Sequence, residues 1–382
     1  MSSNQIYSYS FPTNVRFGAG AINELPGYLK ENKLSNPLVV TDPNVADLSF
    51  FKKIISELRA AGIGAEVFSD ISKNPVKSDV LKGGNAYEDF NSDSIVGIGG
   101  GAAMDVSRAI ALRINNRRDL FDYDDLQGGD IYVTEPIPHF VTVPTTSGTG
   151  SEVGRSAIIS EDESKKKRIL FHPTLLAKHV FADPELTYEL PAFITAATGM
   201  DALTHNLEAY LSKNYHPLSS GIALEGVKII GASIEQATNN SNPQSRADML
   251  IGSLMGAVAF QKGLGVVHSL AHPLSSLVDM HHGLANAICL PYGMEFNIEG
   301  QEDKFKDIAY ALGIENASGS DVLEYLRELN QKLGLPTKLS EQGVSTDQTD
   351  TLAQLAVDDF CHPNNPKPVG LEDFKALYTK AI

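Results

Sequence analysis

The first half of the chain alternates short runs of apolar, β-branched residues with segments of helical spacing. Four runs indicate buried strands: 38–41, 65–68, 94–98 and 139–143. Segments between these runs, such as 50–61 and 104–114, repeat apolar residues at intervals of three and four, as amphipathic helices do. Because strands that alternate with helices form parallel sheets covered on both faces, the pattern predicts an α/β domain.

The second half of the chain has a different periodicity, which begins after the turn at Asp183-Pro184. Residues 196–211, 219–237, 245–259 and 266–278 carry apolar residues at helical intervals and contain few β-branched clusters. We place the boundary within the stretch bracketed by two prolines, near residues 185–190. The expected organisation is therefore an α/β domain with a parallel sheet over residues 1–187 and an all-helical domain over residues 188–382.

Composition indicates a folded protein and narrows its partners. Apolar residues make up 42% of the 382 residues and charged residues 20%, which is enough to bury a large core. The excess of 47 acidic over 31 basic residues gives a net charge of −16, which repels nucleic acid. We expect no membrane span and a cytoplasmic location, since the chain has neither a leader-like N-terminus nor eighteen consecutive apolar residues. With two cysteines, Cys289 and Cys361, a metal would be held by histidine and carboxylate.

Two glycine-rich turns follow predicted strands. Gly99-Gly100-Gly101 joins a strand to a helix, where the backbone can approach a phosphate and the helix N-terminus offers unpaired N–H groups. Residues 145–152 follow the next strand and combine glycines with hydroxyl groups. A glycine cluster alone is as typical of a tight turn, but two such turns at one sheet edge favour a dinucleotide.

Asp42 ends the first predicted strand. A carboxylate there could accept both ribose hydroxyls and repel a 2′-phosphate, which favours NAD over NADP. However, Asp42 precedes the glycines, whereas the acidic residue of the usual dinucleotide fingerprint follows them by about twenty residues. An Asp-Pro surface turn is an equally good interpretation.

Histidine and aspartate recur at a spacing of four in the helical half. Asp201 and His205 share one helix face, His268 and His272 repeat the spacing, and His281-His282 opens a further segment. One such pair is an ordinary feature of helix surfaces. Three segments that each supply imidazole favour a metal site of one Asp and three His with an open position, which suits iron(II) or zinc.

At these residues the chain resembles the iron-containing (group III) alcohol dehydrogenase family, which has the dehydroquinate synthase-like fold. The resemblance covers essentially the full chain. It rests on Phe17-Gly18-Ala19-Gly20, Asn74-Pro75, Gly99-Gly100-Gly101, 144–152, 201–205, 268–273 and 282–287. It implies a dinucleotide-binding α/β domain, an all-helical domain, and substrate and metal in the cleft between them.

The resemblance also implies a role for individual residues. It places the metal ligands on Asp201, His205, His268 and His282, with His281 as the competitor of His282. It places His272 beside the nicotinamide and substrate, where it is a candidate proton relay or else a hydrogen-bonded core histidine. It places the dinucleotide on Asp42, Asn74, Gly99, Gly100, Gly101, Asp105, Thr145, Thr146 and Thr149. The chain departs from the family pattern at Ala102, at Ser275-Ser276 and at His281.

The expected activity is that of a metal-dependent, NAD(H)-linked alcohol dehydrogenase or aldehyde reductase. A divalent ion would ease loss of the alcohol proton, and hydride would then pass to nicotinamide. Arg155 is a candidate for binding an anionic substrate, although pairing with Glu152 is the alternative. His362 is a candidate pocket residue or a polar loop residue.

Other activities and assemblies stay open at this point. A glycerol dehydrogenase-like polyol oxidoreductase, a dehydroquinate synthase-like lyase and a non-catalytic nucleotide-binding relative are the alternatives. The substrate is expected to be a small alcohol or aldehyde. From the family we expect a homodimer or a higher homo-oligomer, with residues 7–17 suited to pairing between subunits.

Overall fold

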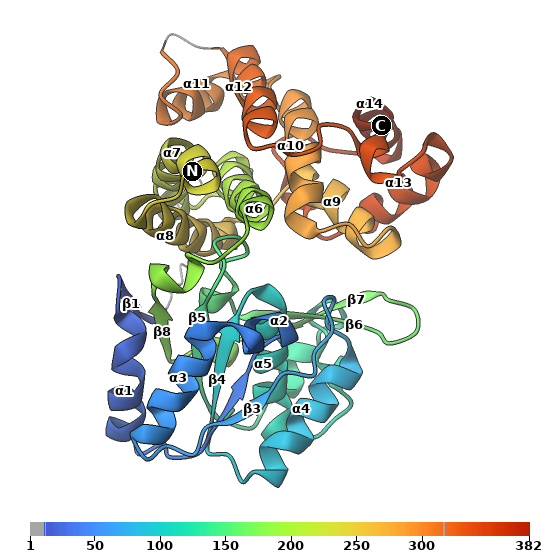
Figure 1. Cartoon of the computed structure of the whole chain (residues 1–382). Coiled ribbons are helices and arrows are strands. Elements are labelled where there is room, and N and C mark those ends of the chain that lie inside the picture. Colours follow the sequence, from blue (N-terminus) through green and yellow to red (C-terminus); the bar gives the residue numbers. More distant parts are fainter. Residues whose placement is uncertain (1–10, 12, 316–317) are drawn as a thin grey trace, which may run out of the picture. The chain divides into compact units, whose positions relative to one another are not determined.

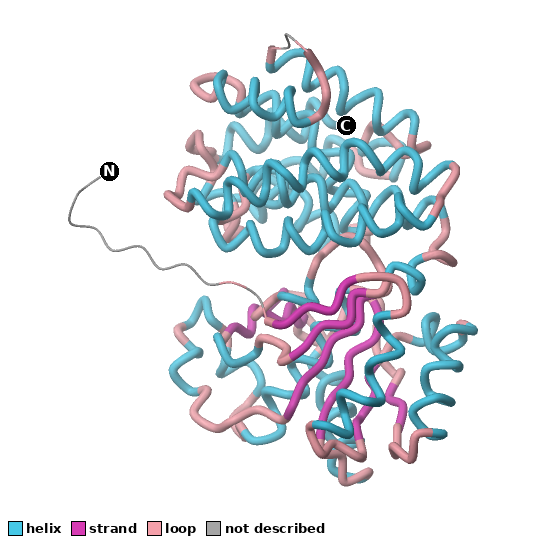
Figure 2. Tube along the Cα trace, turned by 90° about the vertical axis from the view of Figure 1, so that its left-hand side faces the viewer, coloured by secondary structure: helices cyan, strands magenta, loops and turns pink. Residues whose placement is uncertain are grey.

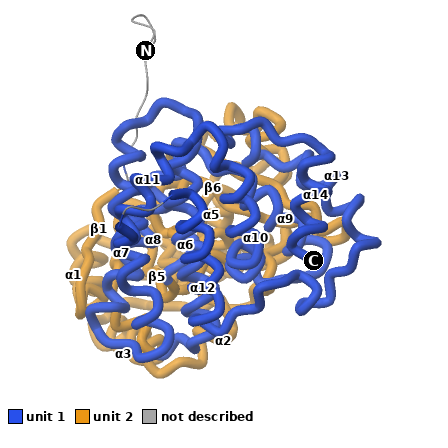
Figure 3. The backbone as a smooth tube through the Cα atoms, turned by 90° about the horizontal axis from the view of Figure 1, so that it is seen from above, with its two compact units in different colours: residues 1–11, 147–149, 189–382 blue, residues 12–146, 150–188 orange. Residues whose placement is uncertain are grey.

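The computed structural model describes residues 11, 13–315 and 318–382, and the described chain divides into two compact units (Figure 3). The α/β unit extends to residue 188 but omits residues 147–149. The helical unit contains residues 189–382 together with residues 147–149. The predicted fold class, an α/β domain with a parallel sheet followed by a helical region, is confirmed.

The α/β unit is built on a six-stranded parallel sheet in the order β1-β8-β5-β4-β2-β3 (Figures 1 and 2). Its strands are β1 (Asn14–Phe17), β2 (Pro37–Val40), β3 (Glu66–Phe68), β4 (Ser94–Gly99), β5 (His139–Pro144) and β8 (His179–Ala182). Every residue of β2 and β4 is buried, as expected of central parallel strands with both faces covered. β2 lies between β3 and β4, so the strand order reverses there.

Successive residues of the central strands pack into two separate cores, one on each face of the sheet. Val39 and Val96 contact the helices α1 (Leu25–Glu31) and α3 (Ser49–Ala60). Leu38 and Ile95 pack with α4 (Lys77–Asp89) and α5 (Gly101–Asn115). This alternation is the period of two that places neighbouring side chains on opposite faces of a strand. A short helix, α2 (Pro43–Asp47), follows β2 directly.

Three strands of the α/β unit were not predicted. β6 (Ser156–Ser160) and β7 (Lys167–Phe171) form an antiparallel hairpin, and the basic residue Arg168 pairs there with Glu161 and Asp124. The third is β8, at residues 179–182, which pairs in parallel with the short strand β1. Of the segment expected to pair between subunits, residues 14–17 form β1 within this chain, and residues 7–10 and 12 lie outside the described residues.

The helical unit surrounds the long, almost fully buried helix α6 (Ala192–Leu211). The four predicted helices correspond to α6, α7 (Pro217–Asn239), α8 (Pro243–Ala259) and α9 (Val266–Leu277). They are followed by α10 (His282–Asn297), α11 (Glu302–Ala311), α12 (Gly319–Lys332), α13 (Thr349–Val357) and α14 (Leu371–Ala381). Within the described residues no single helix has both the length and the apolar character to cross a membrane, and one pair, 243–262 with 266–277, passes that test jointly with a bend of 108°.

Candidate metal centre and nucleotide-binding edge

Four of the predicted site residues meet where α6, α9 and α10 come together. Asp201 and His205 project from the same face of α6, since they are one turn apart, while His268 lies on α9 and His282 is the first residue of α10. From Oδ1 of Asp201 the Nε2 atoms of His205 and His268 are both 3.8 Å away, and that of His282 is 3.5 Å away. The side chain of His282 is 29% exposed, so the otherwise buried cluster has one accessible side.

The amide of Asn286 occupies the middle of this cluster. Its Nδ2 lies 2.7 Å from Oδ1 of Asp201, 3.2 Å from Nε2 of His282 and 3.4 Å from Nε2 of His268. Three acceptor atoms thus point at one positively polarised group. One carboxylate oxygen and imidazole nitrogens are donors that first-row divalent metals accept, and their convergence fits such an ion. Asn286 was not predicted, although its spacing of four from His282 on α10 is a signal for it.

Their surroundings shift the pKa values of two of these histidines in opposite directions. Burial lowers the pKa of His205 to about 4, despite the opposing charge of Asp201, so its imidazole is neutral at neutral pH. Burial also lowers the pKa of His268, but its hydrogen bond to Glu208 and the nearby carboxylates raise that pKa above the ordinary value overall. Since Nδ1 of His268 lies 2.6 Å from Oε2 of Glu208, Nδ1–H donates to the carboxylate, and in the neutral ring the lone pair is therefore on Nε2.

His272 stands beside the cluster, one helical turn after His268. Its Nδ1 lies 2.7 Å from Oδ2 of Asp359, and its ring stacks on that of His282 with centroids 5.3 Å apart. Burial raises the pKa of Asp359, but the facing His272 and the hydrogen bonds from Ser269 and the backbone of residue 361 lower it below the usual value overall. The pair therefore has Nδ1–H donating to a carboxylate and a free Nε2. His272 thus lies against His282 and His268, with its Nδ1 held by Asp359.

The glycine-rich turn of the α/β unit lies where the strand order reverses, between the carboxyl ends of β2 and β4. Gly99 has φ +151°, and a Cβ placed on it would lie 2.7 Å from Cβ of Ala103, so this turn requires glycine. Gly100 is the N-cap of the 15-residue helix α5, which begins at Gly101, and it makes no side-chain hydrogen bond to the first N–H groups of that helix. The uncapped N-terminus offers donors to an anion.

Asp42 caps a helix and also lies beside the glycine-rich turn. Its Oδ1 accepts hydrogen bonds from the N–H groups of Asn44 and Val45, which caps α2. Its Oδ2 lies 3.5 Å from where a Cβ of Gly99 would be, so the second oxygen faces the glycine turn. The carboxylate is both a helix cap and a group at the predicted nucleotide edge.

Other predicted cofactor residues lie near this edge or behind it. The N–H of Thr145 donates to the carbonyl of Gly99, and the hydroxyl of Thr146 faces Gly100. Asn74 is exposed in the turn before α4, and Thr149 belongs to the segment grouped with the helical unit. Asp105 points inward instead. It accepts hydrogen bonds from Ser151, Ile158 and the buried Arg108, which occupy both its oxygens.

The two predicted substrate residues differ in their surroundings. Arg155 is half-buried after the second glycine-rich turn, and no ion pair joins it to Glu152 in the described part of the chain. The ring of His362 packs edge-on against Phe374, and its Nε2 lies 3.0 Å from the carbonyl oxygen of Val357. His362 therefore packs within the helical unit, where it begins the short 3-10 helix His362–Asn364.

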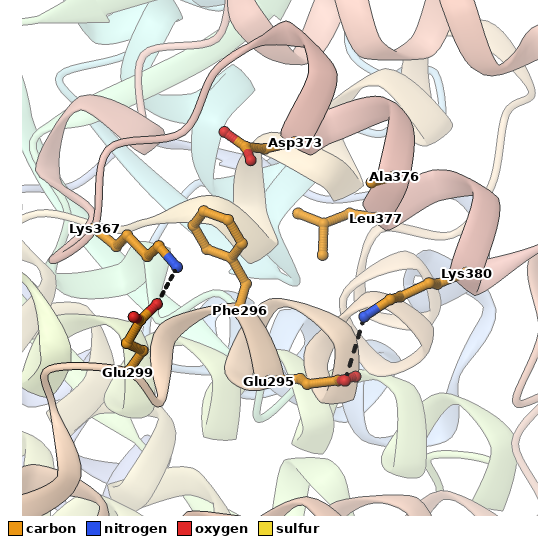
Figure 4. A pocket seen from close by; sticks show the side chains of 8 residues that line it. All are labelled: Glu295, Phe296, Glu299, Lys367, Asp373, Ala376, Leu377 and Lys380. Atoms are coloured by element: carbon orange, nitrogen blue, oxygen red, sulfur yellow. Dashed lines mark hydrogen bonds and ion pairs between the residues drawn. The ribbon is translucent and has the colours of Figure 1, made fainter.

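A surface pocket of about 230 Å³ between α10 and α14 contains none of the predicted site residues (Figure 4). Lys367 pairs with Glu299 at 2.9 Å and Lys380 with Glu295 at 3.3 Å. Because both lysines of the pocket are paired, it has no unbalanced cation to attract an anionic ligand.

Two family models match the chain. Residues 12–184 match the model described as iron-containing alcohol dehydrogenase, and residues 195–382 match the Fe-containing alcohol dehydrogenase family, C-terminal. The 4-hydroxybutyrate dehydrogenase of Cupriavidus necator is 35% identical over 381 residues, covering 97% of this chain and 98% of that protein. The lactaldehyde reductase of Escherichia coli K12 is 30% identical over 372 residues, covering 96% and 97%.

Solved structures resemble the fold over the whole chain. A crystal structure of 1,3-propanediol oxidoreductase has a TM-score of 0.94 at 33% identity, covering 99% of this chain and 100% of that one. The structure of sulfoacetaldehyde reductase from Bifidobacterium kashiwanohense in complex with NAD+ has a TM-score of 0.88 at 25% identity, covering 99% of each chain.

Proposed function

The chain belongs to the iron-containing alcohol dehydrogenase family, and on this premise we propose that it is a metal-dependent, NAD(H)-linked enzyme that interconverts small alcohols and their aldehydes. The observation that supports this most directly is that the Nε2 atoms of His205, His268 and His282 all lie within 3.8 Å of Oδ1 of Asp201. Relatives named lactaldehyde reductase and 1,3-propanediol dehydrogenase support the class of substrate.

We propose Asp201, His205, His268 and His282 as the ligands of a divalent metal. Such an ion polarises the oxygen of an alcohol or aldehyde and so assists hydride transfer. Iron(II) is our first assignment and zinc the second, because the donor set accepts both. One carboxylate against three neutral imidazoles leaves half of a divalent charge uncompensated, and the partly exposed side at His282 gives a substrate access to it.

His272 is our candidate for the proton transfer. Asp359 holds the proton on Nδ1, so that Nε2 can accept a proton from an alcohol or return it to the product of aldehyde reduction. Burial of Asp201 and His268 keeps water from their side of the cluster. A dry surrounding strengthens the electrostatic effect of every nearby charge on the developing oxygen charge.

The nucleotide edge is proposed to hold NAD. Gly99, Gly100 and Gly101 would take the pyrophosphate, with Asn74, Thr145, Thr146 and Thr149 around it, and Asp42 would bind the adenosine ribose. The negative charge of Asp42 disfavours a 2′-phosphate, which supports NAD over NADP. The structure of a neighbour with NAD+ bound supports the same class of cofactor. Asp105 would act indirectly, by supporting the start of α5 from inside the unit.

A narrower proposal is that the substrate carries a negative charge. The half-buried Arg155 has no ion pair with Glu152, and relatives named 4-hydroxybutyrate dehydrogenase and sulfoacetaldehyde reductase fit anionic substrates. Arg155→Ala should raise KM for aldehydes that bear a carboxylate or sulfonate by at least tenfold relative to neutral aldehydes of the same length. Equal changes in kcat/KM for both sets would rule this proposal out, and His362 would then need the same comparison.

The test of the main proposal combines metal analysis with turnover. Protein purified without oxygen should contain one divalent metal per chain, and NADH absorbance should change with a panel of small alcohols and aldehydes. A chelator should abolish the change and added iron(II) or zinc should restore it. A lyase would give no net NADH, and a non-catalytic relative would bind NAD without turnover. Full activity of His268→Ala with its metal retained would refute the proposal. The homo-oligomeric state and cytoplasmic location stay predictions.

A further inference from the structure

Glu208 lies next to the proposed metal ligands without belonging to them. It is on α6, three residues after His205 and seven after Asp201, so all three side chains share one face of that helix. Its side chain is only 1% exposed. A buried carboxylate is costly unless its oxygens are fully hydrogen-bonded, so the partners of Glu208 indicate why it is there.

Both oxygens of Glu208 are bound by the first turn of α9. Oε1 accepts from the N–H of Val267 at 2.6 Å. Oε2 accepts from Nδ1–H of His268 at 2.6 Å and from the N–H of the same residue at 3.4 Å. The two backbone groups belong to the start of a helix, where N–H groups lack partners within the helix and the dipole favours a negative charge. The N–H groups at the start of α9 therefore hold the carboxylate of Glu208 in place, and this carboxylate in turn orients the ring of His268.

Gly265, directly before α9, lets the backbone approach Glu208 closely. A Cβ placed on Gly265 would lie 3.0 Å from Oε1 of Glu208 and 2.6 Å from Oδ1 of Asn365. That amide oxygen accepts from the N–H of Val266 at 3.2 Å. Asn365 thus caps the same helix start as Glu208 but makes no hydrogen bond to the ring of His268, which makes it a matched control.

We propose that Glu208 is a positioning residue for the metal ligand His268. It keeps the proton on Nδ1, directs Nε2 toward Asp201 and His205, and makes that nitrogen a stronger donor through the negative charge behind the ring. The inference rests on the proposed function, because it assumes that His268 binds the metal. It differs from a purely structural role, in which Glu208 would only cap α9.

The experiment measures metal affinity rather than activity. Apoprotein prepared with a chelator is titrated with Co²⁺ in competition with a chromophoric chelator, for the wild type, Glu208→Gln, Glu208→Asp and Asn365→Ala. A glutamine has one oxygen, which cannot serve both Val267 and His268. Glu208→Gln should weaken Co²⁺ binding by about 10- to 100-fold, the range for loss of such a partner. Asn365→Ala should stay within about threefold of the wild type, since the orientation of His268 is kept.

Each result decides the matter. A folded Glu208→Gln protein whose Co²⁺ affinity falls less than tenfold below the wild type overturns the inference, as does an equal loss in Asn365→Ala. If circular dichroism shows that Glu208→Gln is unfolded, Glu208→Asp decides, because it keeps the charge but withdraws the oxygens by about 1.5 Å. A loss of tenfold or more supports the inference, and a smaller loss rejects it. A wild-type protein that binds no Co²⁺ refutes the proposed function itself, and the inference with it.

Discussion

Replacing Gly283 with alanine tests whether the close approach of α10 to α6 determines the position of His282 in the proposed metal site. Gly283 directly follows the proposed ligand His282. A Cβ at this position would lie 2.3 Å from the carbonyl oxygen of Ala197 and 2.7 Å from its carbonyl carbon. These are backbone atoms of a buried helix and cannot rotate away, so α10 must shift by about 1 Å to reach ordinary contact distance. We expect a loss of about 1–3 kcal/mol in the free energy of unfolding, as for other overpacked sites.

The same shift should weaken metal binding more than it weakens the fold. Nε2 of His282 is 3.5 Å from Oδ1 of Asp201, and metal–ligand distances tolerate changes of only about 0.2 Å, so a displacement of about 1 Å removes one ligand. Urea unfolding and Co²⁺ titration of the apoprotein measure the two effects. Gly221→Ala is the control, since a Cβ there meets nothing within 4 Å and alanine in the exposed interior of α7 should stabilise by about 0.5–1 kcal/mol. Wild-type stability and affinity in Gly283→Ala would refute this reasoning.

Three further predictions concern charge. Asp359→Asn should lower kcat at least tenfold with metal content unchanged, because His272 loses the acceptor that fixes its tautomer; an unaltered kcat and pH profile would contradict this. Asp42→Asn keeps the cap of α2 but removes the charge, so kcat/KM with NADP relative to NAD should rise about tenfold, and an unchanged ratio would count against the ribose role. Burial raises the pKa of Glu152 from 4.5 to about 7, although Arg108 opposes the rise. The stability that Glu152 contributes is therefore fully present below pH 4.5 and is lost as the pH rises through 7, by about 3 kcal/mol in total. Urea unfolding from pH 4 to 8 should show that Glu152→Gln becomes more stable relative to the wild type as the pH rises. A difference in unfolding free energy that does not change with pH would disprove this.

The fold was predictable where a buried element gives a clear hydrophobic pattern in the sequence. β2 and β4 are buried on both faces, so they appear in the sequence as continuous apolar runs. The family membership that the motifs predicted is also confirmed. The hairpin β6–β7 was missed because β7 begins with Lys167 and Arg168. The charge of Arg168 is neutralised by Glu161 and Asp124, and these partners cannot be recognised from local sequence.

The candidate ligands were predictable because they come in local pairs, whereas their supporting residues do not. Asp201 and His205 are four residues apart and share a helix face by geometry alone. By contrast, Glu208 is 60 residues from His268, and Asp359 is 87 residues from His272. A glutamate or aspartate on a helix or loop normally indicates a solvated surface, so only the tertiary packing of α6, α9 and the segment after α13 identifies these two as buried.

The two histidines of α9 have similar partners on one side of the ring, but we propose different roles for them. His268 and His272 lie on one helix face, and the Nδ1 of each lies 2.6–2.7 Å from a buried carboxylate, so Nε2 is the nitrogen of each ring that points away from that carboxylate. The two histidines differ in the residues that contact the rest of each ring. His268 stacks on His205 with centroids 4.6 Å apart and faces Asp201, whereas His272 stacks on the partly exposed His282 and lies 5.5 Å from the ring of Phe360. An Nε2 atom surrounded by other metal-binding atoms favours a cation, whereas an Nε2 atom near the accessible side favours proton exchange with a substrate.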